Sequence, residues 1–365
     1  MQITRRSSIK TMAAGAAAIA LFHSEWSAAA TQSKPVIRIA FNENPDGPSP
    51  AARAAIRAGA DVANRYVMDE LTELERRIAQ REGVSSDEIV LGTGSGEVLA
   101  MAGAAFGIGG GEIVCADNTF DLLPKYAAAV GAKLAQVPLT KTFHHDLEKM
   151  SATVNPQTSL VYVCNPNNPT GTLLDAATLR AFCEDASKIT TVLVDEAYID
   201  FEPDLSGSMI GMVQQGKNVI VTRTFSKIFG MAGMRIGYGV APKPVAEKLK
   251  RLRMTWINHL SVTAALASLG ETEFVRSSRA RNAAARDAFC GALSGHNIRY
   301  VPSHTNFIYV YAGPNNRALP RKLLENGVMI NRDGKPLDGD WVRVSVGTLA
   351  EMQSAASAFL KVYEA

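Results

Sequence analysis

The chain has 365 residues, of which 47% are hydrophobic and 20% are charged, and its formal net charge is +3. A single hydrophobic core rarely grows to this length, so two domains with a cleft between them are expected. The composition excludes a disordered or fibrous chain, and the small net charge gives no reason to expect binding to nucleic acid or to an anionic membrane. The four cysteines lack metal-ligand or disulfide-framework spacing, so no metal site is expected; they are Cys115, Cys164, Cys183 and Cys290.

The first thirty residues have the layout of an export signal. Arg5 and Arg6 are followed by an alanine-rich apolar run over residues 11–22, too short for a stable membrane span, and then by three alanines at 28–30. This order resembles a twin-arginine signal and predicts a periplasmic protein, cleaved between Ala30 and Thr31. An uncleaved N-terminal anchor and a chance Arg-Arg pair in a cytoplasmic protein are the alternatives.

From residue 70 onward, apolar strand patterns alternate with helical patterns such as residues 122–130 and 176–187. Unbroken apolar strands between helices predict an α/β fold with a mostly parallel sheet sandwiched by helices. We expect residues 70–257 to form this large domain. Residues 258–365 are expected to form a smaller α+β domain, completed by the segment 31–69. The predicted strands are 89–91, 113–115, 134–137, 160–164, 192–194, 219–222, 236–240, 307–311 and 341–346.

Ligands of such sheets bind at the carboxyl ends of the strands, and the stretch 223–235 follows one of them. A buried lysine amine, here Lys227, forms an imine with an aldehyde. Arg235 follows across a glycine-containing turn and, with the hydroxyls of Thr224 and Ser226, suits a phosphate group. This combination predicts a pyridoxal 5'-phosphate (PLP) site in which Lys227 forms the Schiff base. A solvated loop is the alternative for a Ser-Lys pair alone.

Two neighbouring strand ends supply groups for the cofactor ring. Asp195 ends an apolar strand, where a buried carboxylate needs a partner, and a protonated pyridine nitrogen is such a partner. Tyr198 and Asn168 are placed to hydrogen-bond the ring hydroxyl. A helix cap at Asp195 and a plain stiff turn around Asn168 are the alternatives.

Two further segments complete the predicted site. Ser95 and Gly96 open a helix after a strand, and the amides of a helix N-terminus bind phosphate, although this signal is weak by itself. Phe120 is expected either to stack on the ring or to lie in the core. Arg343 stands within an apolar strand and is expected to bind the α-carboxylate of the substrate, with an internal salt bridge as the alternative.

Together these segments resemble the histidinol-phosphate aminotransferase branch of the fold type I PLP enzymes. The likeness covers nearly everything after residue 36. It implies a homodimer in which Tyr66 of one subunit reaches the PLP phosphate of the other, and a ping-pong mechanism in which Lys227 also moves a proton. The matching segments are 41–45, 64–66, 164–171, 195–198, 223–235, 305–307 and 343–348.

The resemblance also implies substrate contacts from Asn306 and from the stretch 327–332. The family's substrate-phosphate arginine aligns with Asn331, and Arg332 is displaced by one position. Because a one-residue shift turns a strand side chain to the opposite face, the likeness does not extend to phosphate recognition. Asn331 and Arg332 stay candidate substrate-binding residues.

We therefore expect a PLP-dependent aminotransferase that moves an amino group between an amino acid, aromatic or basic, and a 2-oxo acid. Two alternatives share this scaffold. One is a PLP-dependent decarboxylase of a phosphorylated amino acid. The other is a non-catalytic periplasmic binding protein, against which an imine-forming lysine argues because simple binding does not require it.

Overall fold

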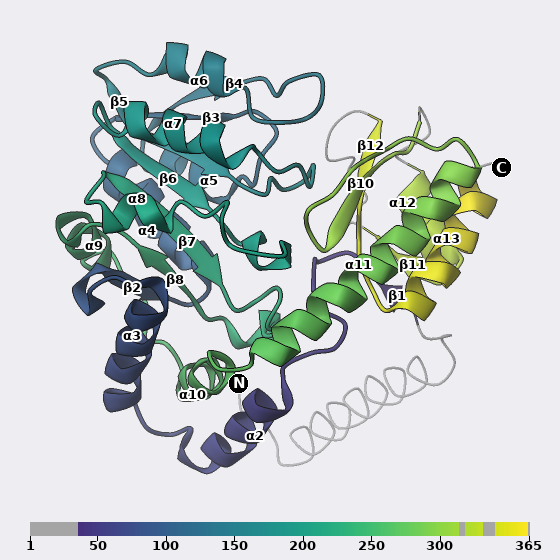
Figure 1. The fold of residues 1–365 in the computed structure, drawn as a ribbon, viewed down its shortest axis with the longest axis horizontal. Coiled ribbons are helices and arrows are strands. Elements are labelled where there is room, and N and C mark those ends of the chain that lie inside the picture. The colour runs from purple at the N-terminus through teal and green to yellow at the C-terminus, as the bar shows by residue number, and fades with distance from the viewer. Residues whose placement is uncertain (1–35, 314–317, 331–339, 364–365) are drawn as a thin grey trace, which may run out of the picture.

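The computed structural model describes residues 36–313, 318–330 and 340–363, and it shows two α/β units of unequal size (Figure 1). The predicted export signal lies outside the described residues. No described helix is both long and apolar enough to cross a membrane.

The larger unit contains a seven-stranded sheet in the order β2-β8-β7-β6-β5-β3-β4. Every strand runs parallel to its neighbours except β8, which is antiparallel to both β2 and β7. The predicted fold class is therefore confirmed. The strands are β2 (Ile89–Gly92), β3 (Glu112–Ala116), β4 (Lys133–Val137), β5 (Thr158–Cys164), β6 (Thr191–Asp195), β7 (Val219–Thr224) and β8 (Gly237–Val240).

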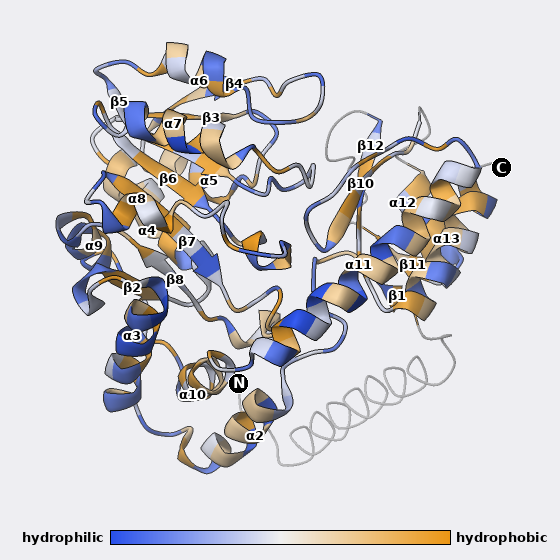
Figure 2. Ribbon diagram, in the orientation of Figure 1, coloured by the Kyte–Doolittle hydropathy of each residue, from blue (hydrophilic) through white to orange (hydrophobic). Residues whose placement is uncertain are grey.

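Helices cover both faces of this sheet because its strands are apolar on both sides. Along β6, Leu193 belongs to one buried cluster, whereas Val192 and Val194 belong to the other. Figure 2 shows the central strands in hydrophobic colours, with β7 turning hydrophilic near its carboxyl end. One face carries α4 (Ser95–Gly107), α5 (Leu122–Ala129) and α9 (Lys243–Lys250). The other carries α3 (Asp69–Glu82), α6 (Leu147–Thr153), α7 (Ala176–Ala186) and α8 (Ile210–Gln214).

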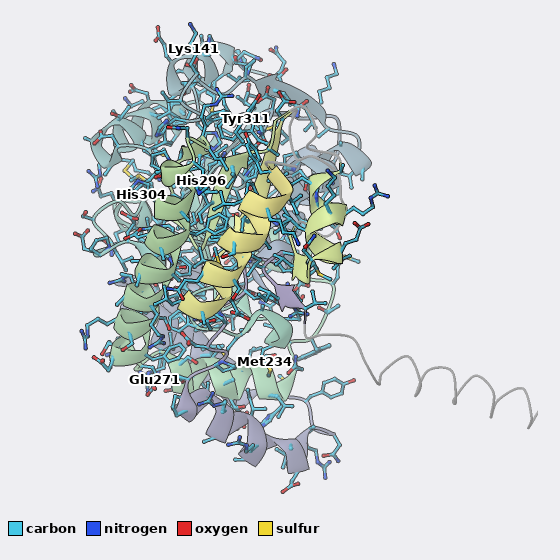
Figure 3. All side chains as sticks on the ribbon, turned by 90° about the vertical axis from the view of Figure 1, so that its right-hand side faces the viewer. Lys141, Met234, Glu271, His296, His304 and Tyr311 are labelled. Atoms are coloured by element: carbon cyan, nitrogen blue, oxygen red, sulfur yellow. The ribbon has the colours of Figure 1, made fainter. Side chains whose placement is uncertain are left out.

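The smaller unit is built on an antiparallel sheet in the order β12-β10-β9. Its helices surround a separate apolar cluster, and α11 and α13 lie side by side (Figure 3). Its elements are α11 (Thr272–Gly295), β9 (Tyr300–Val301), β10 (Phe307–Tyr311), α12 (Leu319–Glu325), β11 (Val328–Met329), β12 (Trp341–Ser345) and α13 (Leu349–Tyr363).

The N-terminal segment is divided between the two units, which corrects the expectation that residues 31–69 belong with the small one. Strand β1 (Ile37–Arg38) pairs with β11 of the small unit. Helix α2 (Pro50–Gly59) packs against α10 (His259–Ser268), and both contribute side chains to the large core. Helix α10 therefore also lies with the large unit, although it follows residue 257, because its apolar residues face α2 and α3.

Candidate active site

The carboxyl ends of β5, β6 and β7 form the floor of a cavity of about 550 Å³. Asp195 and Thr224 are the last residues of their strands, and Asn168 and Lys227 follow theirs closely. The small unit adds Arg343 from β12. The cavity thus brings together eleven of the sequence-predicted site residues: Ser95, Gly96, Phe120, Asn168, Asp195, Tyr198, Thr224, Ser226, Lys227, Arg235 and Arg343.

Lys227 carries the amine on which the predicted chemistry depends. Its Nζ lies 3.5 Å from the backbone carbonyl oxygen of Phe41 and 5.4 Å from the ring centre of Tyr198. Burial, aided by the positive charges of Arg343 and Arg235, lowers the pKa of Lys227 to about 8. A substantial fraction of this amine is therefore neutral, and hence nucleophilic, close to physiological pH.

Asp195 is 2% exposed at the floor of the cavity. Its carboxylate accepts hydrogen bonds from the hydroxyls of Thr222 at 2.8 Å and Tyr162 at 3.5 Å. Burial raises the pKa of Asp195 to about 6, and the hydrogen bond from Thr222 opposes that rise. A carboxylate in this state is stabilised by any cation that enters the cavity beside it.

Tyr198 and Asn168 form one hydrogen-bonded group with residues from distant parts of the chain. The Tyr198 hydroxyl accepts from Asn42 Nδ2 at 2.9 Å and from Asn168 Nδ2 at 3.5 Å. Arg343 Nη1 donates to Asn168 Oδ1 at 2.7 Å, and its Nη2 donates to the carbonyl of Ala40 at 3.1 Å. Burial raises the pKa of Tyr198, so its phenol stays protonated at neutral pH.

Arg343 is the more informative member of this group. Its Nε is buried and has no hydrogen-bond partner among the described residues. Within those residues no carboxylate lies within 4.0 Å of its guanidinium, so the internal salt bridge considered from the sequence is not formed there. A buried guanidinium in this condition has capacity for an anionic ligand.

The opposite end of the cavity is suited to a phosphate. Arg235 adopts a left-handed backbone conformation (φ 59°), and its Nη1 donates to Ser226 Oγ at 3.3 Å and to the carbonyl of Ala232 at 2.8 Å. Its Nη2 lies so close to Gly94 (φ 86°) that a Cβ there would be 2.5 Å away. The arginine therefore lies against the turn that opens α4, whose N-terminal dipole also favours an anion.

Four predicted site residues do not lie in this cavity. Tyr66 is 79% exposed beside Trp256, with 5.5 Å between the ring centres. Asn306 is buried elsewhere, where its Nδ2 donates to the carbonyl of Glu43 at 3.3 Å. Asn306 is thereby corrected from a substrate contact to a support for the N-terminal segment, because this bond turns its side chain toward that backbone. Asn331 and Arg332 lie outside the described residues.

Three cavity residues were not among the predicted site residues, namely Phe41, Asn42 and Glu43. Asn42 also exchanges hydrogen bonds with Ser345, 303 positions away in the sequence. No local pattern marks such a residue. Its only signal in the sequence is that it stands in the segment 41–45, which matches the family.

Comparison with known proteins identifies the chain. The family model for aminotransferase class I and II matches residues 34–359. The chain belongs to this family. It is 37% identical to the histidinol-phosphate aminotransferase of Moorella thermoacetica over 90% of this chain and 86% of that protein. It is also 37% identical to histidinol-phosphate aminotransferase 1 of Dechloromonas aromatica, over 87% of each chain.

A solved structure supports the same relation. The histidinol-phosphate aminotransferase of Sinorhizobium meliloti in complex with pyridoxal-5'-phosphate superposes with a TM-score of 0.83 at 28% identity, and 91% of each chain is covered. The chain is therefore a PLP-dependent aminotransferase of fold type I, similar to the histidinol-phosphate enzymes. Of the three interpretations of the sequence, transamination is the one confirmed.

The cavity fits PLP on observations of its own. Arg235 has no carboxylate within 4.0 Å among the described residues, although it lies at a helix N-terminus where an anion is favoured. Asp195 gains from a cation at the floor, and Lys227 offers a neutral amine between them. These groups match the phosphate, the ring nitrogen and the aldehyde of the cofactor.

Proposed function

We propose that Lys227 is both the attachment point for PLP and the group that moves the proton in amino-group transfer, and that Arg343 binds the α-carboxylate of the substrate. The observation that carries this proposal is the buried Lys227 amine, with its pKa lowered to about 8, in a cavity that also contains a buried guanidinium able to bind an anion. An amino acid and a 2-oxo acid share that carboxylate, so one residue serves both halves of the reaction.

The remaining residues hold the cofactor. Arg235, Ser226, Thr224 and the first turn of α4 bind the phosphate, Asp195 keeps the ring nitrogen protonated, and Tyr198 and Asn168 bind the ring hydroxyl. When bound, PLP supplies an electron-withdrawing ring that stabilises negative charge at the substrate Cα. The residues themselves contribute orientation and exclude water from the floor.

Proton transfer belongs to Lys227. Once the substrate amine has replaced it on the cofactor, the Lys227 amine accepts the proton from the substrate Cα and later returns it. Arg343 holds the carboxylate on the side of Asn168, which fixes the direction in which the Cα proton points.

Replacing the lysine tests this assignment. In Lys227→Ala, single-turnover amino transfer should fall by roughly 10²–10⁴-fold, the usual contribution of a general acid/base group. Borohydride treatment followed by peptide mass analysis should find the cofactor on Lys227 in the wild type and on no residue of the variant. Full amino transfer by Lys227→Ala, or a cofactor adduct on another lysine of the wild type, would refute the assignment.

The donor is proposed to be an amino acid with a free α-carboxylate. The named relatives are histidinol-phosphate enzymes, whereas Arg343 recognises a carboxylate. A panel of aromatic and basic amino acids with 2-oxo acids, run beside histidinol phosphate, tests this choice. Activity with histidinol phosphate alone among the donors would reject it.

We also propose a homodimer in which Tyr66 reaches the partner's cofactor. Support comes from the exposure of apolar side chains around it: Tyr66 is 79%, Trp256 61% and Met254 85% exposed. Large exposed apolar side chains in one place are typical of an interface. Mixing the inactive Lys227→Ala and Tyr66→Ala variants should restore activity, because the hybrid dimer contains one complete site; a monomer in sedimentation experiments rejects the proposal.

Finally, we propose export by the twin-arginine route, supported by Arg5, Arg6 and the apolar run that follows them. This route carries folded proteins, which suits a chain that must bind PLP before crossing. Replacing both arginines by lysine should leave the protein in the cytoplasm of a bacterial host. Equal periplasmic yield of the two forms rejects the route.

A further inference from the structure

A second, smaller cavity of about 170 Å³ lies behind the N-terminal segment and shares no lining residue with the Lys227 cavity. Its walls come from residues 44–46, from α11, and from the turn into α13. Pro45, Phe201, Ala284 and Leu349 make much of the lining apolar. An apolar cavity of about 150 Å³ stays free of water and accepts a benzene-sized ring, so this cavity is large enough for such a ring.

One polar atom within this lining lacks a partner. Asn306 is 2% exposed, and its Oδ1 accepts no hydrogen bond from any described residue. The amide cannot simply be turned over, because Nδ2 donates to the carbonyl of Glu43 at 3.3 Å and an oxygen in that place would face another oxygen. A buried acceptor without a donor is unfavourable, which leaves a site where a ligand hydroxyl or N–H gains a hydrogen bond.

The cavity has a route to solvent. Arg281, on α11, pairs with Asp46 at 2.7 Å, and its side chain is 51% exposed. Leu349, which begins α13, is 46% exposed. Both residues line the cavity, so a small molecule can enter by moving surface side chains and without unfolding the core.

We propose that this cavity is a second ligand site, which takes a small aromatic ring carrying one hydrogen-bond donor, of the phenol or indole class. The ring occupies the apolar part, and the donor binds Asn306 Oδ1. The site is distinct from the site of amino transfer and does not depend on which substrate the enzyme uses.

The position of the site connects it to the catalytic cavity. Asn44, which lines the small cavity, donates through Nδ2 to the carbonyl of Ile228 at 2.8 Å, next to Lys227. Asn306 holds the carbonyl of Glu43, which lines the Lys227 cavity. A ligand bound here ties the wall segment to α11 and α13, and thereby restricts movement between the two units. Both KM for the amino donor and kcat are expected to fall about twofold or more, since a restraint on opening slows release of product.

Binding itself is tested first, on the PLP-loaded full chain. Phenol and toluene have the same shape and differ in the hydroxyl. Phenol should bind at least about tenfold more tightly than toluene by calorimetry, the value of one hydrogen bond to an otherwise unpaired acceptor. Phenol should also raise the thermal midpoint, because a ligand that binds only the folded state stabilises it. Equal affinity of the two compounds, or no binding of either, overturns the proposal.

Cavity-filling variants assign the binding to this place. Ala284→Leu on α11 should abolish phenol binding, whereas Ala280→Leu, an exposed position one turn earlier on the same helix and outside the lining, should leave it unchanged. Leu349→Phe fills the cavity from the α13 side and gives a second test if Ala284→Leu does not fold. Unchanged phenol binding in a folded, filled variant places the ligand elsewhere and overturns the site.

Discussion

The floor and the wall of the catalytic cavity are held by different kinds of structure. The floor lies at the ends of β5, β6 and β7, where Asp195 pairs in register with Thr222 and the strands are buried on both sides. The wall consists of residues 41–43 and Arg343, and a few side-chain hydrogen bonds attach it, such as Asn42 to Tyr198 and Arg343 to Asn168. The difference suggests a division of labour, in which a rigid floor fixes the chemistry and a separately attached wall fixes what binds.

The strongest way to break the floor is through its buried ion pair. Arg223 at the end of β7 is 2% exposed and donates to Glu196 at 3.0 Å, with Glu82 at 3.7 Å. Arg223→Leu leaves buried carboxylates without their counter-ion and should lower the free energy of unfolding by about 3–5 kcal/mol. Urea unfolding of the purified variant measures this.

An exposed pair provides the control for that change. Arg76 and Glu73 are 2.6 Å apart on α3, and their side chains are 56% and 40% exposed. Arg76→Leu should change the free energy of unfolding by less than about 1 kcal/mol, because solvent screens such a pair. Comparable losses in the two variants would show that burial of the Arg223 pair is not what makes the floor rigid.

A second prediction concerns Asp195 and pH. Burial raises its pKa from 3.8 to about 6 in the folded apoenzyme, so the folded state binds more protons than the unfolded state between these values. Stability of the apoenzyme should therefore fall as pH rises from about 4 to about 6, by an amount on the order of 3 kcal/mol. Asp195→Asn removes this titration, and its apoenzyme should keep a flatter profile in that window. Parallel pH profiles for the two proteins would contradict the raised pKa.

The same division explains what could be predicted from the sequence. Strand β10 has the bounds expected for it, and β5, β6 and β7 differ from expectation by a few residues at their ends, because unbroken apolar runs identify buried strands. Floor residues such as Asp195 and Lys227 could be located because each follows such a run. Their catalytic roles are predictions that the variants above test.

The wall was less accessible to sequence reasoning. Asn42 lies 156 positions before Tyr198, and no periodicity connects residues so far apart. Asn306 was assigned to the substrate because its motif matches the family, but its side chain supports the backbone of Glu43. The place of α10 depends on which helix its apolar face meets, and that contact with α2 is set by the tertiary fold.

Arg343 is the residue through which the wall can be separated from the floor. Arg343→Leu removes a charge-assisted contact to the substrate carboxylate worth about 1.5–3 kcal/mol, so kcat/KM should fall roughly 10–150-fold. The absorption spectrum of bound PLP should stay unchanged, because the groups that hold the cofactor remain. Arg343→Lys should recover part of the loss, since it keeps the charge without the bidentate geometry. Loss of PLP from the variant would place Arg343 with the floor.

The smallest expected effect comes from a contact that fastens the wall from outside. Phe143 lies in the loop between β4 and α6 of the large unit, and its ring centre is 4.8 Å from that of Trp341 on β12, two residues before Arg343. The carbonyl of Phe143 accepts from the Thr172 hydroxyl at 2.9 Å, which ties the loop to the turn that carries Asn168. Figure 3 labels Lys141 of this loop and Tyr311 of β10 toward the same end of the molecule. The ring thus joins the strand of Arg343 to the turn of its hydrogen-bond partner.

Phe143 has a left-handed backbone (φ 63°), which allows backbone strain to be separated from the ring contact. Phe143→Ala loses aromatic contacts worth about 0.5–1.5 kcal/mol and should raise KM for the amino donor severalfold with little change in kcat, because Arg343 is positioned less firmly. Phe143→Gly accepts the positive φ more readily, so its thermal midpoint should exceed that of the alanine variant, yet its KM should be raised equally. If glycine restored both the midpoint and KM, the loop conformation rather than the ring would be what positions the wall.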